Sequence, residues 1–238
     1  MDDLNDFMIH RPPTRERPLL GVTILVVEDS RFACEALRLL SIRSGARIRR
    51  ADSLSSAQRH LKVYRPTVAI IDEGLPDGSG ASLIASLHAE AARIPVILGS
   101  SGDEAARASA IEAGADGFIA KPIARLAEFQ QAILEHLPDA FCPPGPRLLG
   151  EEEIIPDPIA MSDDMAHAAN LLSTRCDPET IAYLRQFLDS IAQSAQDRPM
   201  GDALADLAAA RRQGLSEMGA VEALSHVVQS KLSDSKVI

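Results

Sequence analysis

Five short apolar segments alternate with five segments of helical periodicity over the first 138 residues, and this alternation constrains the fold more than any other feature. The expected strands cover residues 22–27, 46–50, 68–71, 94–98 and 117–120, and the expected helices cover 30–44, 53–63, 81–90, 104–113 and 126–137. Strict alternation of strand and helix favours a parallel sheet with right-handed crossovers. We therefore expect an α/β fold, with a doubly wound five-stranded parallel sheet between two layers of helices.

Two proline-rich segments divide the chain. Residues 1–20 contain a charged, Pro-rich run and are expected to form a flexible extension. Residues 139–158 are rich in proline and contain an acidic run at 151–153, and they are expected to be a linker. The domain at 21–138 would then be followed by a smaller all-α domain at 159–238, with helices near 160–172, 178–194, 202–213 and 217–232.

Charge is distributed unevenly between the two parts. Residues 1–142 hold 16 basic and 19 acidic side chains, whereas residues 143–238 hold 8 basic and 15 acidic ones. Because affinity for nucleic acid comes largely from neutralising phosphates, an acidic domain is a poor candidate for binding it. A nucleic-acid partner is therefore not expected for the C-terminal part.

The composition favours a cytoplasmic protein. The three cysteines, Cys34, Cys142 and Cys176, are scattered and show no metal-binding spacing, which suits a reducing compartment. The N-terminus is acidic and lacks the apolar run of a signal peptide, and no apolar stretch is long enough to cross a membrane. No membrane partner is expected.

Polar side chains follow the expected strands where each strand ends. Glu28 and Asp29 close the first strand, Asp72 closes the third, Ser100 follows the fourth and Lys121 follows the fifth. In doubly wound folds the carboxyl ends of the strands form the ligand site, so these side chains should converge. Three carboxylates so close together would repel one another, and oxygen ligands of this kind suit Mg²⁺.

These segments resemble the receiver domain of two-component response regulators (the CheY-like, flavodoxin-like fold). The resemblance covers about residues 21–138 and is carried by four pieces that stand in the family's order. They are ILVVEDS at 24–30, IIDEGLPDGSG at 70–80, PVILGS at 95–100 and GADGFIAKP at 114–122.

The resemblance implies a role for each matching residue. Asp72 would accept the phosphoryl group, Glu28 and Asp29 would hold Mg²⁺ with Asp29 as a direct ligand, and Gly74 would offer its backbone carbonyl to the metal. The remaining roles fall to the switch hydroxyl Ser100, the switch aromatic Phe118, the phosphate-contacting Lys121 and, after an expected cis peptide bond, Pro122. The expected donor is a sensor histidine kinase or a phosphotransfer protein.

Some assignments stay open. Gly99 stands where the family usually has a larger apolar residue, and Ser101 follows directly, so either Ser100 or Ser101 is the switch hydroxyl. His167 and His226 lie on expected helices but lack the Lys and Gly that follow a phosphotransfer histidine. The basic patch of Arg43, Arg47, Arg49 and Arg50 is interpreted as a solvated face, with a surface for an acidic partner as the alternative.

The helical domain is expected to act by protein–protein interaction or as a homodimer, on an output protein that the sequence does not identify. Phosphorylation of Asp72 would favour one of two arrangements and change the face from about residue 103 to 137. The alternative is a transcription regulator with a helix-turn-helix in 200–232, although its central segment has only Arg211 and Arg212 as basic residues. No enzymatic output is expected, because residues 143–238 show no nucleophile–base pair and no phosphate loop.

Overall fold

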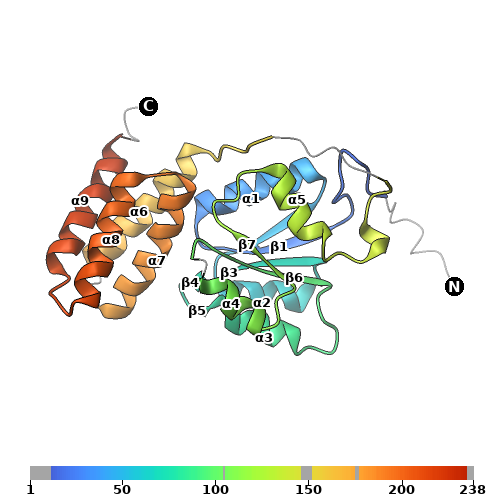
Figure 1. Cartoon of the computed structure of the whole chain (residues 1–238), viewed down its shortest axis with the longest axis horizontal. Coiled ribbons are helices and arrows are strands. Elements are labelled where there is room, and N and C mark those ends of the chain that lie inside the picture. The colour runs from blue at the N-terminus through green and yellow to red at the C-terminus, as the bar shows by residue number, and fades with distance from the viewer. Residues whose placement is uncertain (1–11, 104, 146–151, 175–176, 235–238) are drawn as a thin grey trace.

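The computed structural model describes the chain except for residues 1–11, 104, 146–151, 175–176 and 235–238. Figure 1 shows an α/β domain beside a group of four long helices that forms the C-terminal part. Within the described residues, no helix is both long enough and apolar enough to cross a membrane.

The sheet has five parallel strands in the order β2-β1-β3-β6-β7, as the alternation predicts. Its strands are β1 (Thr23–Val27), β2 (Arg47–Ala51), β3 (Val68–Asp72), β6 (Val96–Ser101) and β7 (Gly117–Ala120). The segment after β3 contains a two-stranded hairpin of β4 (Gly74–Leu75) and β5 (Gly78–Ser79). The register pairs Asp72 of β3 with Ser100 of β6, which places both residues at the same edge of the sheet.

Helices cover both faces of this sheet (Figure 1). One face packs against α1 (Arg31–Ser44) and α5 (Leu126–Leu134), and the other against α2 (Leu54–Val63), α3 (Gly80–His88) and α4 (Ala105–Glu112). The largest fully buried side chain is Phe129 of α5, which lies in the first of these two cores. Because parallel strands are covered on both faces, β3 is buried along its whole length.

Two segments outside the expected domain boundaries also pack against this domain. Leu19 is fully buried, and its backbone N–H donates to the carbonyl of Ser44. Ile154 is buried in the core beside α5, and its N–H donates to the carbonyl of Ala124. Residue 154 is therefore attached to the α/β domain, although it lies within the segment expected to be a linker.

The C-terminal helices form a bundle around a core of their own. Its members are α6 (Pro158–Thr174), α7 (Pro178–Ser194), α8 (Arg198–Arg212) and α9 (Met218–Asp234). Leu188 of α7 and Val228 of α9 are fully buried in it. Helix α8 begins four residues earlier than the expected start at 202, because Asp197 caps its N-terminus and a proline occupies the first turn.

Gly99 of β6 has too little space around it for a side chain. A Cβ atom there would lie 2.6 Å from the Cβ of Ala110 in α4 and 3.1 Å from the Cδ2 of Phe118. Ala110 and Phe118 therefore occupy the space that a larger residue at this position would need.

Gly99→Ala is accordingly expected to lower the free energy of unfolding by about 1–3 kcal/mol, because α4 must move away from the sheet. Denaturant unfolding would measure the change. Gly219→Ala in α9 is the matched control, since a Cβ there has no neighbour within 4 Å and a helical alanine is favourable. Equal stabilities for the two variants would contradict the prediction.

Candidate functional site

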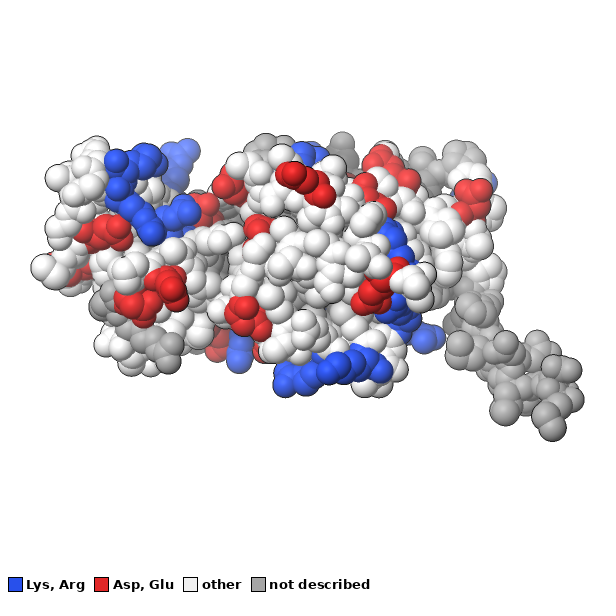
Figure 2. Space-filling view, turned by 90° about the horizontal axis from the view of Figure 1, so that it is seen from below, with Lys and Arg blue, Asp and Glu red and all other residues white. Residues whose placement is uncertain are grey.

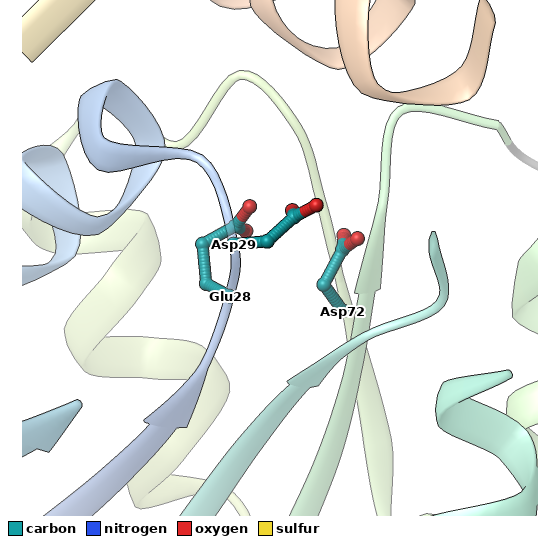
Figure 3. A group of neighbouring side chains, drawn as sticks. All are labelled: Glu28, Asp29 and Asp72. Atoms are coloured by element: carbon teal, nitrogen blue, oxygen red, sulfur yellow. The ribbon is translucent and has the colours of Figure 1, made fainter. Parts of the chain in front are cut away.

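Three carboxylates meet at the carboxyl edge of the sheet. Glu28 and Asp29 follow β1, Asp72 is the last residue of β3, and Figure 3 shows their side chains pointing toward one another. One oxygen from each of the three lies within 4.8 Å of the others. The structure thus brings together the three acidic residues that the strand ends predicted.

Lys121 lies directly beside these carboxylates. Its Nζ is 2.6 Å from Oδ1 of Asp72 and 2.7 Å from Oε2 of Glu28, and only 2% of its side chain is exposed. The Lys121–Pro122 peptide bond is cis, as the resemblance implied.

Burial changes the protonation behaviour of this group. It raises the pKa of Glu28 to about 8, although the charge of Lys121 acts in the opposite direction. It also raises the pKa of Asp29 to about 6, opposed by a hydrogen bond from Tyr183. Burial alone would lower the pKa of Lys121, but Asp72 and Glu28 outweigh it and the pKa is raised. Lys121 therefore stays charged and balances part of the negative charge.

The two candidate switch hydroxyls lie in different surroundings. Ser100 is buried next to Asp72 in the strand register, and its Oγ has no hydrogen-bond partner within the described part of the chain. The Oγ of Ser101 accepts a hydrogen bond from the N–H of Asp103 at 3.1 Å. A buried hydroxyl without a partner is costly, and Ser100 is the one of the two serines whose hydroxyl is left in this state.

Phe118 lies in β7 and Gly74 in β4. Phe118 lies half-buried in β7, with the guanidinium carbon of Arg107 5.0 Å from the centre of its ring. The backbone N–H of Gly74 donates to Oδ2 of Asp72 at 2.9 Å, which fixes that carboxylate against the loop. A Cβ at Gly74 would collide with the side chain of Gln186 in α7.

Sequence reasoning missed the contribution of the helical bundle to this site. Helix α7 passes over the carboxylates in Figure 3, where it is the orange helix above them. Its Tyr183 hydroxyl donates to Oδ2 of Asp29 at 2.5 Å, and the Oγ of Ser190 accepts from the Nζ of Lys121 at 3.0 Å. These partners are 154 and 69 residues apart in the chain, and no local pattern marks them.

Asp164 of α6 makes a second connection between the two domains. Its carboxylate accepts hydrogen bonds from the Oγ of Ser30 at 2.8 Å, the N–H of Arg31 at 2.9 Å and the N–H of Phe32 at 3.0 Å. These groups belong to the N-terminus of α1, where backbone N–H groups lack helical partners and favour negative charge. Asp164 is buried, so the domains are connected by a carboxylate at a helix N-terminus.

The two histidines considered in the sequence are not part of the carboxylate group. His167 of α6 and His226 of α9 are both exposed. His167 lies edge-on against Phe187 with ring centroids 5.7 Å apart. Neither histidine contacts Asp72 in the described structure through an ion pair or hydrogen bond.

Comparison with known proteins identifies the α/β domain. Residues 24–134 match the family model described as the response regulator receiver domain. These residues form a receiver domain. They contain Glu28, Asp29 and Asp72 as well as the β7 end that leads to Lys121, so the whole acidic site lies inside the matched range.

Curated relatives and solved structures match the same part of the chain. The KDP operon transcriptional regulatory protein KdpE of Escherichia coli K12 is 31% identical over 99 residues, and the transcriptional regulatory protein PhoP of E. coli O157:H7 is 29% identical over 100. Each match covers 42% of this chain, and the chain spans 44% and 45% of the length of these relatives.

Among solved structures, the receiver domain of the sensor histidine kinase PA1611 from Pseudomonas aeruginosa is 24% identical, with a TM-score of 0.44. The match covers 48% of this chain and 96% of that one, which holds a magnesium ion in its active-site cleft. A response regulator from Burkholderia pseudomallei with a phosphorylated aspartic acid is 28% identical, with a TM-score of 0.41 and coverage of 50% and 68%.

Proposed function

We propose that this protein is a two-component response regulator in which Asp72 accepts a phosphoryl group and the helical bundle is the output. The observation that carries the proposal is the position of Asp72 at the carboxyl end of β3, within ion-pair distance of the buried Lys121. In the transfer, an Asp72 oxygen forms a bond to phosphorus as the bond between phosphorus and the donor breaks. The donor would be a phosphohistidine of a sensor kinase or phosphotransfer protein, or a small acyl phosphate.

The residues present fit a divalent cation. Glu28, Asp29 and Asp72 offer clustered oxygen ligands of the kind that Mg²⁺ prefers, and the backbone carbonyl of Gly74 would be the fourth protein group. When bound, Mg²⁺ would offset negative charge on the phosphoryl oxygens. Lys121 would hold a phosphoryl oxygen from the other side, and Ser100 would donate the hydrogen bond that its buried hydroxyl lacks here.

The output follows from the same groups. When Lys121 and Ser100 turn toward a phosphoryl group, the β6–β7 edge that carries them must adjust, and Phe118 with it. The guanidinium of Arg107 in α4 lies over the ring of Phe118, so the adjustment would reach α4. The helical bundle would then act on a protein partner or a second copy of the chain.

Incubation with Mg²⁺ and acetyl phosphate tests this proposal. Intact mass should increase by one phosphoryl group, in a linkage that is stable in acid and labile in base. Mass and oligomeric state should be measured on the same sample, so that a change in assembly is detected together with the modification. Absence of any mass gain, with acetyl phosphate and with a phosphorylated donor protein, would refute the proposal.

A DNA-binding output is the second candidate, because the curated relatives are named transcriptional regulatory proteins. The charge of the bundle argues against it: residues 143–238 hold 8 basic and 15 acidic side chains, and acidic groups lie beside the basic group of the bundle on the face in Figure 2. Helices α8 and α9 also lie side by side in Figure 1 instead of crossing steeply. A gel shift at low salt on random-sequence duplexes would detect such binding.

A further inference from the structure

Helix α7 presents two chemically different faces. Leu184, Leu188 and Ile191 are buried in the core of the bundle. The face toward the receiver domain is polar and is formed by residues at helical spacing, namely Tyr183, Gln186, Ser190 and Gln193. We call these four residues the polar stripe of α7.

The polar stripe uses groups that the phosphorylation chemistry needs. An ammonium has three N–H donors. The Nζ of Lys121 lies close to three oxygen atoms, which belong to Asp72, Glu28 and Ser190. A phosphoryl oxygen on Asp72 that binds Lys121 must therefore displace one of them, and Ser190 is the neutral and weakest partner of the three.

Residues of the polar stripe also cover Asp29, Gly74 and Gly102. The Tyr183 hydroxyl occupies one carboxylate oxygen of Asp29, the residue expected to bind the metal directly. Gln186 fills the space beside Gly74, and Gln193 fills the space beside Gly102. The bundle therefore lies over the approach to Asp72 that a phosphodonor protein would use.

Charge at this interface opposes docking once a phosphoryl group is present. A cavity of about 300 Å³ lies between α7 and the receiver domain. The acidic residues that line it are Glu28, Asp29, Asp72, Asp103 and Asp189. Arg185 is the basic residue among the lining residues, and Asp189 belongs to α7 itself. Further negative charge on Asp72 would act against Asp189 across a partly buried gap.

We infer that the polar stripe of α7, together with Asp164, is a docking surface for this chain's own receiver site, so that the bundle masks Asp72 and is released by its phosphorylation. This inference rests on the proposed function. The docked arrangement is the resting state, and the phosphoryl group and the bundle exclude each other. Release would expose the polar stripe for a partner with a similarly acidic site, such as the receiver site of a second copy.

Asp164→Asn tests the masking without replacing a group of the site, because the hydrogen bonds of Asp164 in the described structure go to Ser30, Arg31 and Phe32. The variant weakens three hydrogen bonds to the α1 N-terminus and should speed phosphoryl incorporation from acetyl phosphate by roughly tenfold. Amide hydrogen exchange at Arg31 and Phe32 should also become faster. Asp206→Asn, the same change at an exposed position of α8, is the matched control and should change neither quantity.

Tyr183→Phe gives a second test, in case Asp164→Asn disturbs folding. It removes one hydrogen bond from the polar stripe and should also speed incorporation, whereas Tyr64→Phe removes a hydroxyl without a hydrogen-bond partner in the described structure and should not. In the wild type, phosphorylation should raise exchange at Arg31 and Phe32. Unchanged rates and unchanged exchange in both interface variants would overturn the inference.

The two proposals can fail separately. If no variant gains a phosphoryl group from any donor, the proposed function fails, while exchange still reports whether Asp164 holds the domains together. The wild type could be phosphorylated as fast as Asp164→Asn, with amide exchange at Arg31 and Phe32 unchanged by phosphorylation. In that case the receiver function stands and the masking is refuted.

Discussion

Replacing Lys121 by Met is expected to lower the free energy of unfolding by about 3–5 kcal/mol near neutral pH. The substitution removes the buried cation that lies within 2.7 Å of both Asp72 and Glu28. The three clustered carboxylates would then lack the balancing charge of the Lys121 ammonium. Each carboxylate would either repel its neighbours or take up a proton. Denaturant unfolding of the two proteins under the same conditions measures the difference.

The loss should depend on pH in a defined direction. Burial already raises the pKa of Glu28 to about 8 and that of Asp29 to about 6, and removing Lys121 raises the pKa of Glu28 further. At pH values between the ordinary carboxyl pKa and these raised pKa values, the folded variant therefore binds more protons than the unfolded chain does. Stability consequently falls as pH rises through that range, and the loss is larger at about pH 9 than at about pH 5.

Lys62→Met is the control, because Lys62 is exposed on α2 and its removal leaves no buried charge. Mg²⁺ should restore part of the stability lost in Lys121→Met and have a smaller effect on Lys62→Met. A Lys121→Met protein as stable as the control at every pH would contradict the assignment of Lys121 as the cation that balances the site.

Asp72→Asn is expected to abolish phosphoryl incorporation from acetyl phosphate, because the amide offers no carboxylate oxygen to attack phosphorus. The variant should fold, since an amide at this position still accepts from Gly74 and removes charge from an acidic cluster. Intact mass after incubation with Mg²⁺ and acetyl phosphate measures the effect.

Asp52→Asn provides the comparison for this variant. Asp52 is an exposed aspartate just after β2, whereas Lys121 follows β7. These two strands lie at opposite edges of the sheet. Its removal should leave incorporation unchanged. Retained incorporation in Asp72→Asn, at a base-labile linkage, would move the acceptor to another carboxylate such as Asp29.

The sequence predicted the part of the site that depends on strand ends. Glu28, Asp29, Asp72 and Lys121 each follow an apolar strand, and parallel strands bring their carboxyl ends to one edge, so their meeting required only the alternation. The β4–β5 hairpin was missed because each strand has two residues, too few for any periodicity. The early start of α8 was signalled by Asp197 and the proline two residues after it, a pattern similar to Asp177 and Pro178 at the start of α7.

The contacts between the helical bundle and the site could not be predicted from strand ends or periodicity. Asp164 and Ser30 are separated by 134 residues, and an aspartate within a helical run is normally a solvated residue. Tyr183, Gln186 and Ser190 lie on the polar face of an amphipathic helix, where solvent is the ordinary neighbour. Their contacts depend on how two domains with separate cores meet, and periodicity within one helix carries no information about that.

The attachment of Ile154 limits how far a released bundle could travel. Ile154 is bonded to Ala124 and buried beside α5, and α6 begins at Pro158, so only residues 155–157 connect the two. Three extended residues span roughly 10 Å. A released bundle would thus stay attached to the receiver domain by a short linker. Its local concentration at the receiver site would therefore stay high after every opening. Loss of the phosphoryl group would then allow it to close again without a search through solution, and the duration of the signal would follow the lifetime of the phosphoryl group on Asp72.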